Sequence, residues 1–362
     1  MRLLLTADNI GGVWTFVLNL ARGLSKNGAD VRIAVIGDEM TPGQQDDIDF
    51  TKWYFFKSKQ EWMRDPWMDI REAGKWLLSL ADSIRADVVH LNSYSFGSLP
   101  WKVPVIITAH SCVLSWWESV YRSSVPKEWD EYTRRVTQGI RAADVVVTPS
   151  YDMMKSVEKF YHPSGKKLVI YNGAETSNYL PGNKDDYVFC MGRLWDEAKN
   201  MRLILKAAEG IKHQIYIAGK TAELSVSHPP NVQLLGQLSP HQVAGWLSGA
   251  AVYVLPVRYE PFGYTFLEAA LSGCALVTGD IPSMREIWAD AAVYADPDKS
   301  DSLSRIVNVL MSVTEWRRHL AMKAYTRAVS EYDSDKMLSR YNLLYNNLIN
   351  IGAKRLIKYQ EQ

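Results

Sequence analysis

Short, nearly uninterrupted apolar runs recur along this chain, and each is followed by a turn and a segment with helical spacing of apolar residues. The first two runs are RLLLTAD at residues 2–8 and ADVRIAVIG at residues 29–37, with the helix-like VWTFVLNLARGLSKNG between them. Strands in a parallel sheet need such runs, because helices cover both faces of the sheet. The pattern therefore predicts an α/β protein with doubly wound parallel sheets.

The strand and helix pattern occurs twice, which predicts two domains. The segment YNGAETSNYLPGNKDD at residues 171–186 is rich in Gly, Asn, Pro and charge, as interdomain linkers are. We place the N-terminal domain at residues 1–172, the linker at 173–185 and the C-terminal domain at 186–332. An amphipathic segment from about residue 333 to 362 predicts a final helix with no strand after it.

Composition excludes several classes of protein. The formal net charge of +1 provides no global attraction for nucleic acid. Three widely spaced cysteines argue against a disulfide framework or a zinc site and favour a reducing compartment. No apolar stretch approaches the about 18 residues of a membrane-spanning helix, and the first apolar run is too short for a signal-peptide core. We expect a cytoplasmic location, with peripheral contact at the inner face of a membrane left open and the oligomeric state unknown.

Candidate ligand sites lie at the carboxyl ends of the predicted strands, where open α/β sheets bind ligands. The loop NIGGVW at residues 9–14 contains Gly11 and Gly12, which let the backbone approach a ligand beside a helix N-terminus. The loop does not match G-x-G-x-x-G, which argues against an NAD site. A tight strand-to-helix turn without a ligand explains this loop equally well.

Three further charged or titratable residues follow strand ends. His110 ends the run VPVIITAH, where it would face a cleft or serve as a hydrogen-bonded packing residue. Arg193 and Lys199, in GRLWDEAKN, follow the first strand of the second domain. A guanidinium and an ammonium that converge on a cleft suit a diphosphate, whereas each alone also suits a solvated surface.

The stretch YEPFGYTFLEAALSGCAL at residues 259–276 combines a loop with a helix start. Pro261 and Gly263 prevent one continuous helix, so Glu260 belongs to the loop after the strand AVYVLP. The helix is predicted to begin near Tyr264 or Thr265.

Glu268 then lies about one turn inside this helix. The N–H groups of the helix start would face an anion, and the Glu268 carboxylate can accept hydrogen bonds from a ribose diol or a sugar. The alternative interpretation is charge complementarity with the helix start for Glu268 and solvation for Glu260.

These features, in this order, resemble one family over nearly the whole chain: the retaining, nucleotide-sugar-dependent glycosyltransferases of family four. The matching motifs are NIGG, TAH, AADVVVTPS, YNGAE, MGRL with KN, and the long block LLGQLSPHQVAGWLSGAAVYVLPVRYEPFGYTFLEAALSGCALVTG. The last block contains the family's Glu-x7-Glu signature, between a VLP strand and an LEA-x-x-SG helix. The resemblance implies the GT-B fold, in which two Rossmann-like domains face each other across a cleft and the final helix crosses back to the N-terminal domain.

The resemblance implies a donor site in the second domain. Arg193 and Lys199 would hold the donor diphosphate, Glu268 would bind the ribose hydroxyls, and Glu260 would contact the transferred sugar. The other implied donor contacts are the backbone N–H groups of Phe262, Gly263 and Tyr264, the following Thr265, and Leu238 near the nucleobase.

The N-terminal domain would supply the acceptor side. The resemblance places His110 beside the sugar at the reacting centre and the paired glycines near phosphate and acceptor. Ser111 follows His110 where many relatives have Asp. Next comes an unusually aromatic segment, which would form an acceptor-stacking surface, a belt at a membrane interface, or packing under a loop. Its candidate residues are Trp116, Trp117 and Tyr121.

The implied activity is transfer of a hexosyl group, with retention, from a UDP- or GDP-sugar to a hydroxyl of a sugar, glycolipid or small-molecule acceptor. We expect no metal or other cofactor, because DPD at residues 296–298 and DSD at 333–335 are interpreted as a turn and a helix cap. Two alternatives are a GT-B sugar-nucleotide epimerase, which needs more cleft acids and bases, and a nucleotide-sugar-binding protein without catalysis. Donor sugar, acceptor and linkage are not evident from the sequence.

The segment KSKQEWMRDPW at residues 57–67 mixes basic and aromatic residues. Two interpretations are open: contact with anionic lipid, or a solvated helix face.

Overall fold

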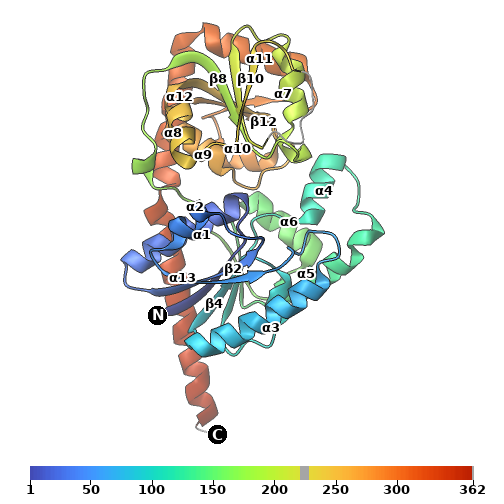
Figure 1. The fold of residues 1–362 in the computed structure, drawn as a ribbon, viewed down its shortest axis with the longest axis vertical. Helices are drawn as coiled ribbons and strands as arrows, with labels where there is room; N and C mark the ends of the chain where they lie inside the picture. Colours follow the sequence, from blue (N-terminus) through green and yellow to red (C-terminus); the bar gives the residue numbers. More distant parts are fainter. Residues whose placement is uncertain (221–227, 361–362) are drawn as a thin grey trace. The chain divides into compact units, whose positions relative to one another are not determined.

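The computed structural model describes residues 1–220 and 228–360, and its contacts divide the chain into two compact units (Figure 1). The first unit contains Met1–Trp117, Ser123–Gly173 and the chain from Ser334 onward. The second contains Ala174–Asp333 and the short piece Glu118–Arg122. Each unit is built around one parallel sheet.

The first sheet has seven strands in the order β3-β2-β1-β4-β5-β6-β7, and every neighbouring pair is parallel. This confirms the predicted doubly wound α/β architecture. The edge strands β3 and β7 were not predicted, because their apolar runs, WYFF and LV, are short and adjoin lysines, and their side chains are only half-buried or exposed. The strands are β1 (Arg2–Ala7), β2 (Asp30–Gly37), β3 (Lys52–Lys57), β4 (Val88–Leu91), β5 (Val105–Thr108), β6 (Val145–Thr148) and β7 (Lys166–Val169).

Helices pack on both faces of this sheet. Leu4 of β1 belongs to a core cluster with residues of α3, α5 and α6, whereas its neighbours Leu3 and Leu5 are equally buried outside that cluster. Successive strand residues point to opposite faces, so the two sets bury the two sides. The elements are α1 (Gly11–Lys26), α2 (Pro42–Ile48), α3 (Trp67–Ile84), η1 (Ser95–Ser98), α4 (Val113–Tyr121), η2 (Lys127–Trp129), α5 (Asp130–Ala142) and α6 (Tyr151–Tyr161).

The second sheet has six strands in the order β10-β9-β8-β11-β12-β13, again all parallel. Helices α7 and α11 pack against each other, and α12 packs on α9 and β12. The strands are β8 (Asp185–Met191), β9 (Gln214–Ala218), β10 (Val232–Gly236), β11 (Ala250–Leu255), β12 (Ala275–Gly279) and β13 (Val293–Ala295). The helices are η3 (Thr176–Asn178), η4 (Glu197–Lys199), α7 (Met201–Ala208), α8 (Pro240–Gly249), α9 (Tyr264–Leu271), α10 (Pro282–Trp288), α11 (Ser300–Ser312) and α12 (Thr314–Glu331).

The final helix, α13 (Ser334–Gln360), returns to the first unit and packs along α1 and β4 (Figure 1). A buried polar cluster joins it to the sheet. His90 Nδ1 lies 2.7 Å from the Tyr345 hydroxyl, and His90 Nε2 lies 2.6 Å from Thr108 Oγ1. The Tyr341 hydroxyl is 3.1 Å from the same Thr108 oxygen. Burial lowers the pKa of His90 to about 3, so the ring is neutral at pH 7.

The interpretation of KSKQEWMRDPW as a solvated helix face is wrong. Residues 58–66 form a loop, and α3 begins only at Trp67. Within the loop Ser58, Gln60 and Glu61 are buried, because their polar atoms bind backbone groups of neighbouring segments. Across the described residues, no helix combines the length and the apolar character that crossing a bilayer requires.

Candidate active site

An ion pair lies at the carboxyl ends of two adjacent strands in the second unit. Lys199, in η4 after β8, places its Nζ 2.5 Å from Oε2 of Glu260, in the loop after β11. Strands β8 and β11 are neighbours in the sheet, which brings their loops together. The two side chains are only 15% and 14% exposed. Removing either partner would therefore leave a poorly hydrated charge without its counter-ion.

The loops that hold this ion pair are fixed by side-chain and backbone hydrogen bonds. Asn200 adopts a left-handed conformation with φ of 58°, and its Nδ2 donates to the carbonyls of Pro256 at 2.9 Å and Pro297 at 2.8 Å. The Arg258 N–H donates to the Ala198 carbonyl at 2.8 Å. The loops after β8, β11 and β13 are thus tied together, and Lys199 is positioned between them.

Arg193 lies in the same loop but has a different environment. Its Nη2 donates to Asp196 Oδ2 at 2.7 Å, and the buried Asp196 carboxylate also accepts from the Ala198 N–H at 3.0 Å. The guanidinium lies over the ring of Trp195 at 5.5 Å. The Arg193 side chain is 44% exposed. Because a guanidinium has five N–H donors in a planar fork, Arg193 can bind an anion without losing Asp196.

Helix α9 begins at Tyr264, which confirms the predicted start and places Glu268 about one turn inside. Gly263 has φ of 89°, and a Cβ there would lie 2.8 Å from the Phe266 side chain. Both the left-handed backbone and the space around it require glycine. The Phe262 and Tyr264 side chains are buried, which suits an implied role for their backbone groups rather than for their rings.

Burial raises the pKa of Glu268 to about 7, and a hydrogen bond from the Tyr179 side chain opposes this rise. Tyr179 follows η3, in the predicted linker, and was missed by the sequence analysis. An isolated tyrosine in a segment rich in Gly, Asn and Pro offers no signal of this contact. Thr265 follows Tyr264 in the first turn of the same helix.

Leu238 follows β10 in the second unit and is half-buried. Gly236, two residues before it, has φ of 70°, and its carbonyl accepts the Gly219 N–H at 2.8 Å. The ends of β9 and β10 are therefore held together beside Leu238. The assignment of Leu238 to a nucleobase stays a prediction.

In the first unit, His110 lies two residues after the end of β5. The Asn92 side-chain amide donates to the Thr6 carbonyl at 2.6 Å, so its Oδ1 is turned to His110 Nε2, 2.8 Å away. His110 therefore carries its proton on Nε2, and Nδ1 is the unprotonated ring nitrogen. The ring packs edge-on against Phe16, with centroids 4.6 Å apart. Burial lowers the pKa of His110 to about 3, so the imidazole is neutral near pH 7.

The glycine loop of the first unit is held in place from one side. Asn9 Nδ2 donates to the Asp38 carbonyl at 2.8 Å, and Gln44 Nε2 donates to the Asn9 carbonyl at 2.8 Å. Gly11 has φ of 63° and begins α1, and both Gly11 and Gly12 are exposed. The start of α1 is accessible, as the predicted anion contact requires.

The aromatic candidates for the acceptor lie on α4. Trp116 and Trp117 are half-buried, with ring centroids 6.3 Å apart, and Trp117 Nε1 donates to Ser123 Oγ at 3.2 Å. Tyr121 is 49% exposed. These side chains are neither fully packed nor fully solvated, and such partly exposed rings could stack on a ligand.

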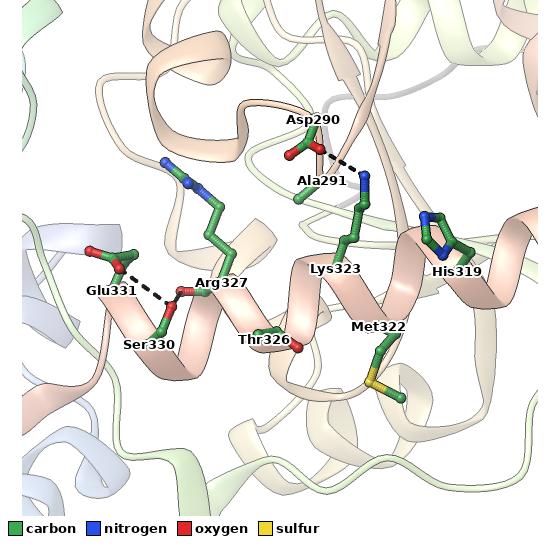
Figure 2. Close-up of a pocket in the computed structure, with 9 residues that line it drawn as sticks. All are labelled: Asp290, Ala291, His319, Met322, Lys323, Thr326, Arg327, Ser330 and Glu331. Atoms are coloured by element: carbon green, nitrogen blue, oxygen red, sulfur yellow. Dashed lines mark hydrogen bonds and ion pairs between the residues drawn. The ribbon is translucent and has the colours of Figure 1, made fainter.

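A shallow groove of about 350 Å³ runs along α12, and none of the predicted donor or acceptor residues lines it (Figure 2). Lys323 pairs with Asp290 at 2.7 Å, and Arg327 Nη2 donates to the Glu286 carbonyl at 3.1 Å. Arg327 thus binds the last turn of α10, where helix carbonyls lack partners, whereas Lys323 binds the Asp290 carboxylate just beyond that helix. Their contacts account for the charge in the groove.

The acidic motif at residues 296–298 forms the predicted turn, and the motif at 333–335 lies at the start of a helix. Asp296 and Asp298 lie in the turn between β13 and α11, and they pair with Lys299 at 2.9 Å and Arg258 at 2.5 Å respectively. Asp333 directly precedes α13. Over residues 1–220 and 228–360, no group of three or more His, Cys, Asp or Glu side chains is arranged to hold a metal ion.

Comparison with known proteins identifies the two halves of the chain. Residues 10–178 match the family described as Glycosyltransferase Family 4, and residues 185–312 match Glycosyl transferases group 1. The O-antigen chain mannosyltransferase RfbU of Salmonella typhimurium is 25% identical over 205 residues, which cover 53% of this chain and 56% of that protein. The aligned region thus spans little more than half of that relative.

Solved structures agree in fold. Sucrose-phosphate synthase from Thermosynechococcus elongatus superposes with a TM-score of 0.80 at 16% identity, covering 97% of this chain and 100% of that one. HepE from Anabaena, in complex with UDP-glucose, superposes with a TM-score of 0.78 at 14% identity, covering 96% and 100%. The fold is that of the GT-B glycosyltransferases. The chain belongs to the family 4, group 1 glycosyltransferases.

Proposed function

We propose that this protein transfers a hexosyl group, with retention of configuration, from a UDP- or GDP-sugar to a hydroxyl of a glycan, glycolipid or small-molecule acceptor. The relative RfbU is named as an O-antigen chain mannosyltransferase, and HepE was solved with UDP-glucose. Both names are compatible with a nucleotide-sugar donor and a glycan product for this chain.

The observation that supports the proposal most strongly is the Lys199–Glu260 ion pair beside the start of α9. An incoming diphosphate would compete with Glu260 for the Lys199 ammonium. The released Glu260 carboxylate could then accept hydrogen bonds from the transferred sugar. One ion pair would thus be exchanged for two contacts with different parts of a single donor, its diphosphate and its transferred sugar.

Charge on the leaving diphosphate would be stabilised by Lys199, Arg193 and the N–H groups at the start of α9. These groups are present in the chain itself, and we propose that turnover needs no metal or other cofactor. Neutral His110 is a poor base, so its unprotonated Nδ1 would accept a hydrogen bond from the sugar. A donor phosphate oxygen would take the acceptor's proton on the face from which the diphosphate leaves.

A donor screen tests this proposal directly. UDP-glucose, UDP-GlcNAc, UDP-galactose and GDP-mannose would be compared by thermal shift and by slow hydrolysis in EDTA. At least one donor should raise the Tm and release nucleoside diphosphate. Binding by none of them would contradict the donor assignment, and hydrolysis that requires an added divalent cation would contradict the metal-independent mechanism.

A further inference from the structure

Glu61 is a buried carboxylate that the proposed site does not yet use. It lies in the loop after β3 and is 5% exposed. Its two oxygens accept the Tyr94 N–H at 3.1 and 3.2 Å, and Oε2 also accepts the Ser95 N–H at 3.0 Å. Both donors lie at the start of η1, where backbone N–H groups lack partners within the helix. Glu61 therefore fixes the backbone that follows β4.

The backbone of Tyr94 is held from the opposite side by α5. A Cβ at Gly139 would lie 1.8 Å from the Tyr94 carbonyl oxygen, so the two backbones are in direct contact. Tyr94 itself is 5% exposed. With Glu61 on its N–H and α5 against its carbonyl, this residue has little freedom to move.

The Tyr94 side chain transmits this position to the end of β5. Its hydroxyl donates to the Ser111 carbonyl and accepts the Ser111 N–H at 3.2 Å. One phenol oxygen therefore holds both backbone polar groups of the residue that follows His110. Asn92, two residues before Tyr94, binds the His110 ring itself at 2.8 Å.

The origin of Glu61 makes this arrangement informative. In the sheet, β3 is separated from β4 by β2 and β1. The loop after β3 crosses the end of β2, where Gln60 Nε2 donates to the Ile36 carbonyl at 2.5 Å, and then reaches Tyr94. If the loop after β3 were only a surface turn, its Glu61 carboxylate would not need to be buried against the segment that follows β4, three strands away from β3 in the sheet.

We propose that Glu61 and Tyr94 are positioning residues for the reaction. By holding the backbone of Ser111, they fix the position of His110 after the end of β5. The inference rests on the proposed function, which assigns His110 to the reacting centre. Catalytic groups must be held within about 0.5 Å of their productive geometry, and a displacement of about 1 Å can lower the rate by about 100-fold.

The variant Tyr94→Phe tests the proposal, because it removes the hydroxyl and keeps the ring. We expect kcat for sugar transfer to fall by roughly tenfold or more, while KM for the donor changes by less than about twofold. Amide hydrogen exchange in a peptide covering residues 108–116 should become at least several-fold faster. Tyr187→Phe is the matched control, because it also removes a phenol that donates to a backbone carbonyl, that of Trp246 at 2.6 Å, but in the second unit.

Glu61→Gln is a second variant that keeps the side-chain shape while replacing one acceptor oxygen by an N–H donor, and it should show the same pattern. Unchanged exchange at residues 108–116 in both variants would overturn the proposal, as would faster exchange with wild-type kcat. An equal loss of kcat in Tyr187→Phe would also overturn it. If the wild type turned over no nucleotide sugar, the proposed function would fail, while the exchange data would still show whether Tyr94 holds the His110 loop.

Discussion

The two units place polar residues at their strand ends in opposite ways. In the second unit, charged side chains face each other, and Lys199 and Glu260 form the ion pair that we propose the donor diphosphate opens. In the first unit, the contacts nearest His110 are hydrogen bonds between neutral groups, His110 with Asn92 and Ser111 with Tyr94, and the buried Glu61 carboxylate accepts backbone N–H groups behind them. The difference fits the proposed division of roles, in which exchangeable charge would bind and stabilise a diphosphate and a fixed hydrogen-bond network would hold His110 in place.

Substitution of Lys199 should have the largest effect on activity. Lys199→Ala removes the ammonium and leaves the Glu260 carboxylate only 14% exposed without its partner. We expect donor turnover to fall by about 100-fold, because one strong electrostatic contact to the leaving group is typically worth that much. Steady-state release of nucleoside diphosphate measures it.

Lys299→Ala is the control for that experiment, because Lys299 pairs with Asp296 in a nearby loop but is 72% exposed. Exposed ion pairs contribute little, so its turnover should equal that of the wild type. Wild-type turnover in Lys199→Ala itself would remove the basis for the donor site described above.

Loss of His110 should have a smaller effect, and its pH dependence tests the contrast between the units. His110→Ala should lower kcat by about tenfold or more, by removing one hydrogen bond to the sugar. Because the pKa of His110 is lowered to about 3, wild-type kcat should show no titration of this residue between pH 5 and 9. A kcat inflection near pH 6.5 that disappears in His110→Ala would contradict a neutral, fixed imidazole.

Glu268 should instead make donor binding depend on pH near neutrality. Its pKa is raised to about 7, and the ionised form accepts ribose hydroxyls best. Affinity for UDP or GDP should therefore rise several-fold as the pH increases from 6 to 8. Calorimetry over that range measures it, and Glu268→Gln, which cannot ionise, should flatten the profile.

The same residue gives a linked prediction for stability. The folded-state pKa of Glu268 lies above the ordinary value of 4.5, so its stabilising contribution is complete below pH 4.5 and is lost as the pH rises through about 7. Between pH 4.5 and 7, the Tm of Glu268→Gln should fall by less than the Tm of the wild type. An identical pH slope for the two proteins would place the Glu268 pKa near its ordinary value.

The smallest effect concerns the buried polar cluster of His90, Thr108, Tyr341 and Tyr345 in the first unit. Tyr345→Phe removes the hydroxyl that lies 2.7 Å from His90 Nδ1, beneath the strand ends of the first unit. Leaving one buried partner unsatisfied should lower the free energy of unfolding by about 1–3 kcal/mol. Urea unfolding measures the loss, and donor affinity should be unchanged because this contact lies in the first unit.

Much of the fold followed from local patterns in the sequence. Apolar runs predicted the central strands of both sheets, because a buried parallel strand must be apolar on both faces. Pro261 and Gly263 predicted the break before α9, and the structure begins that helix at Tyr264. The edge strands β3 and β7 escaped prediction, because their apolar runs are short and adjoin lysines, as the partly solvated edge of a sheet permits.

The contacts among distant segments could not be predicted in the same way. Local spacing located Lys199 and Glu260 at strand ends, but only the sheet order β8-β11 brings their side chains to 2.5 Å. Likewise, nothing near Glu61 in the sequence indicates that it binds Tyr94 beyond two intervening strands. The pKa of Glu268 was equally invisible, because burial and the hydrogen bond from Tyr179 come from residues far along the chain. The sequence is sufficient to identify strand ends and their chemistry, while pairing, burial and protonation depend on which strand ends the folded sheet makes neighbours.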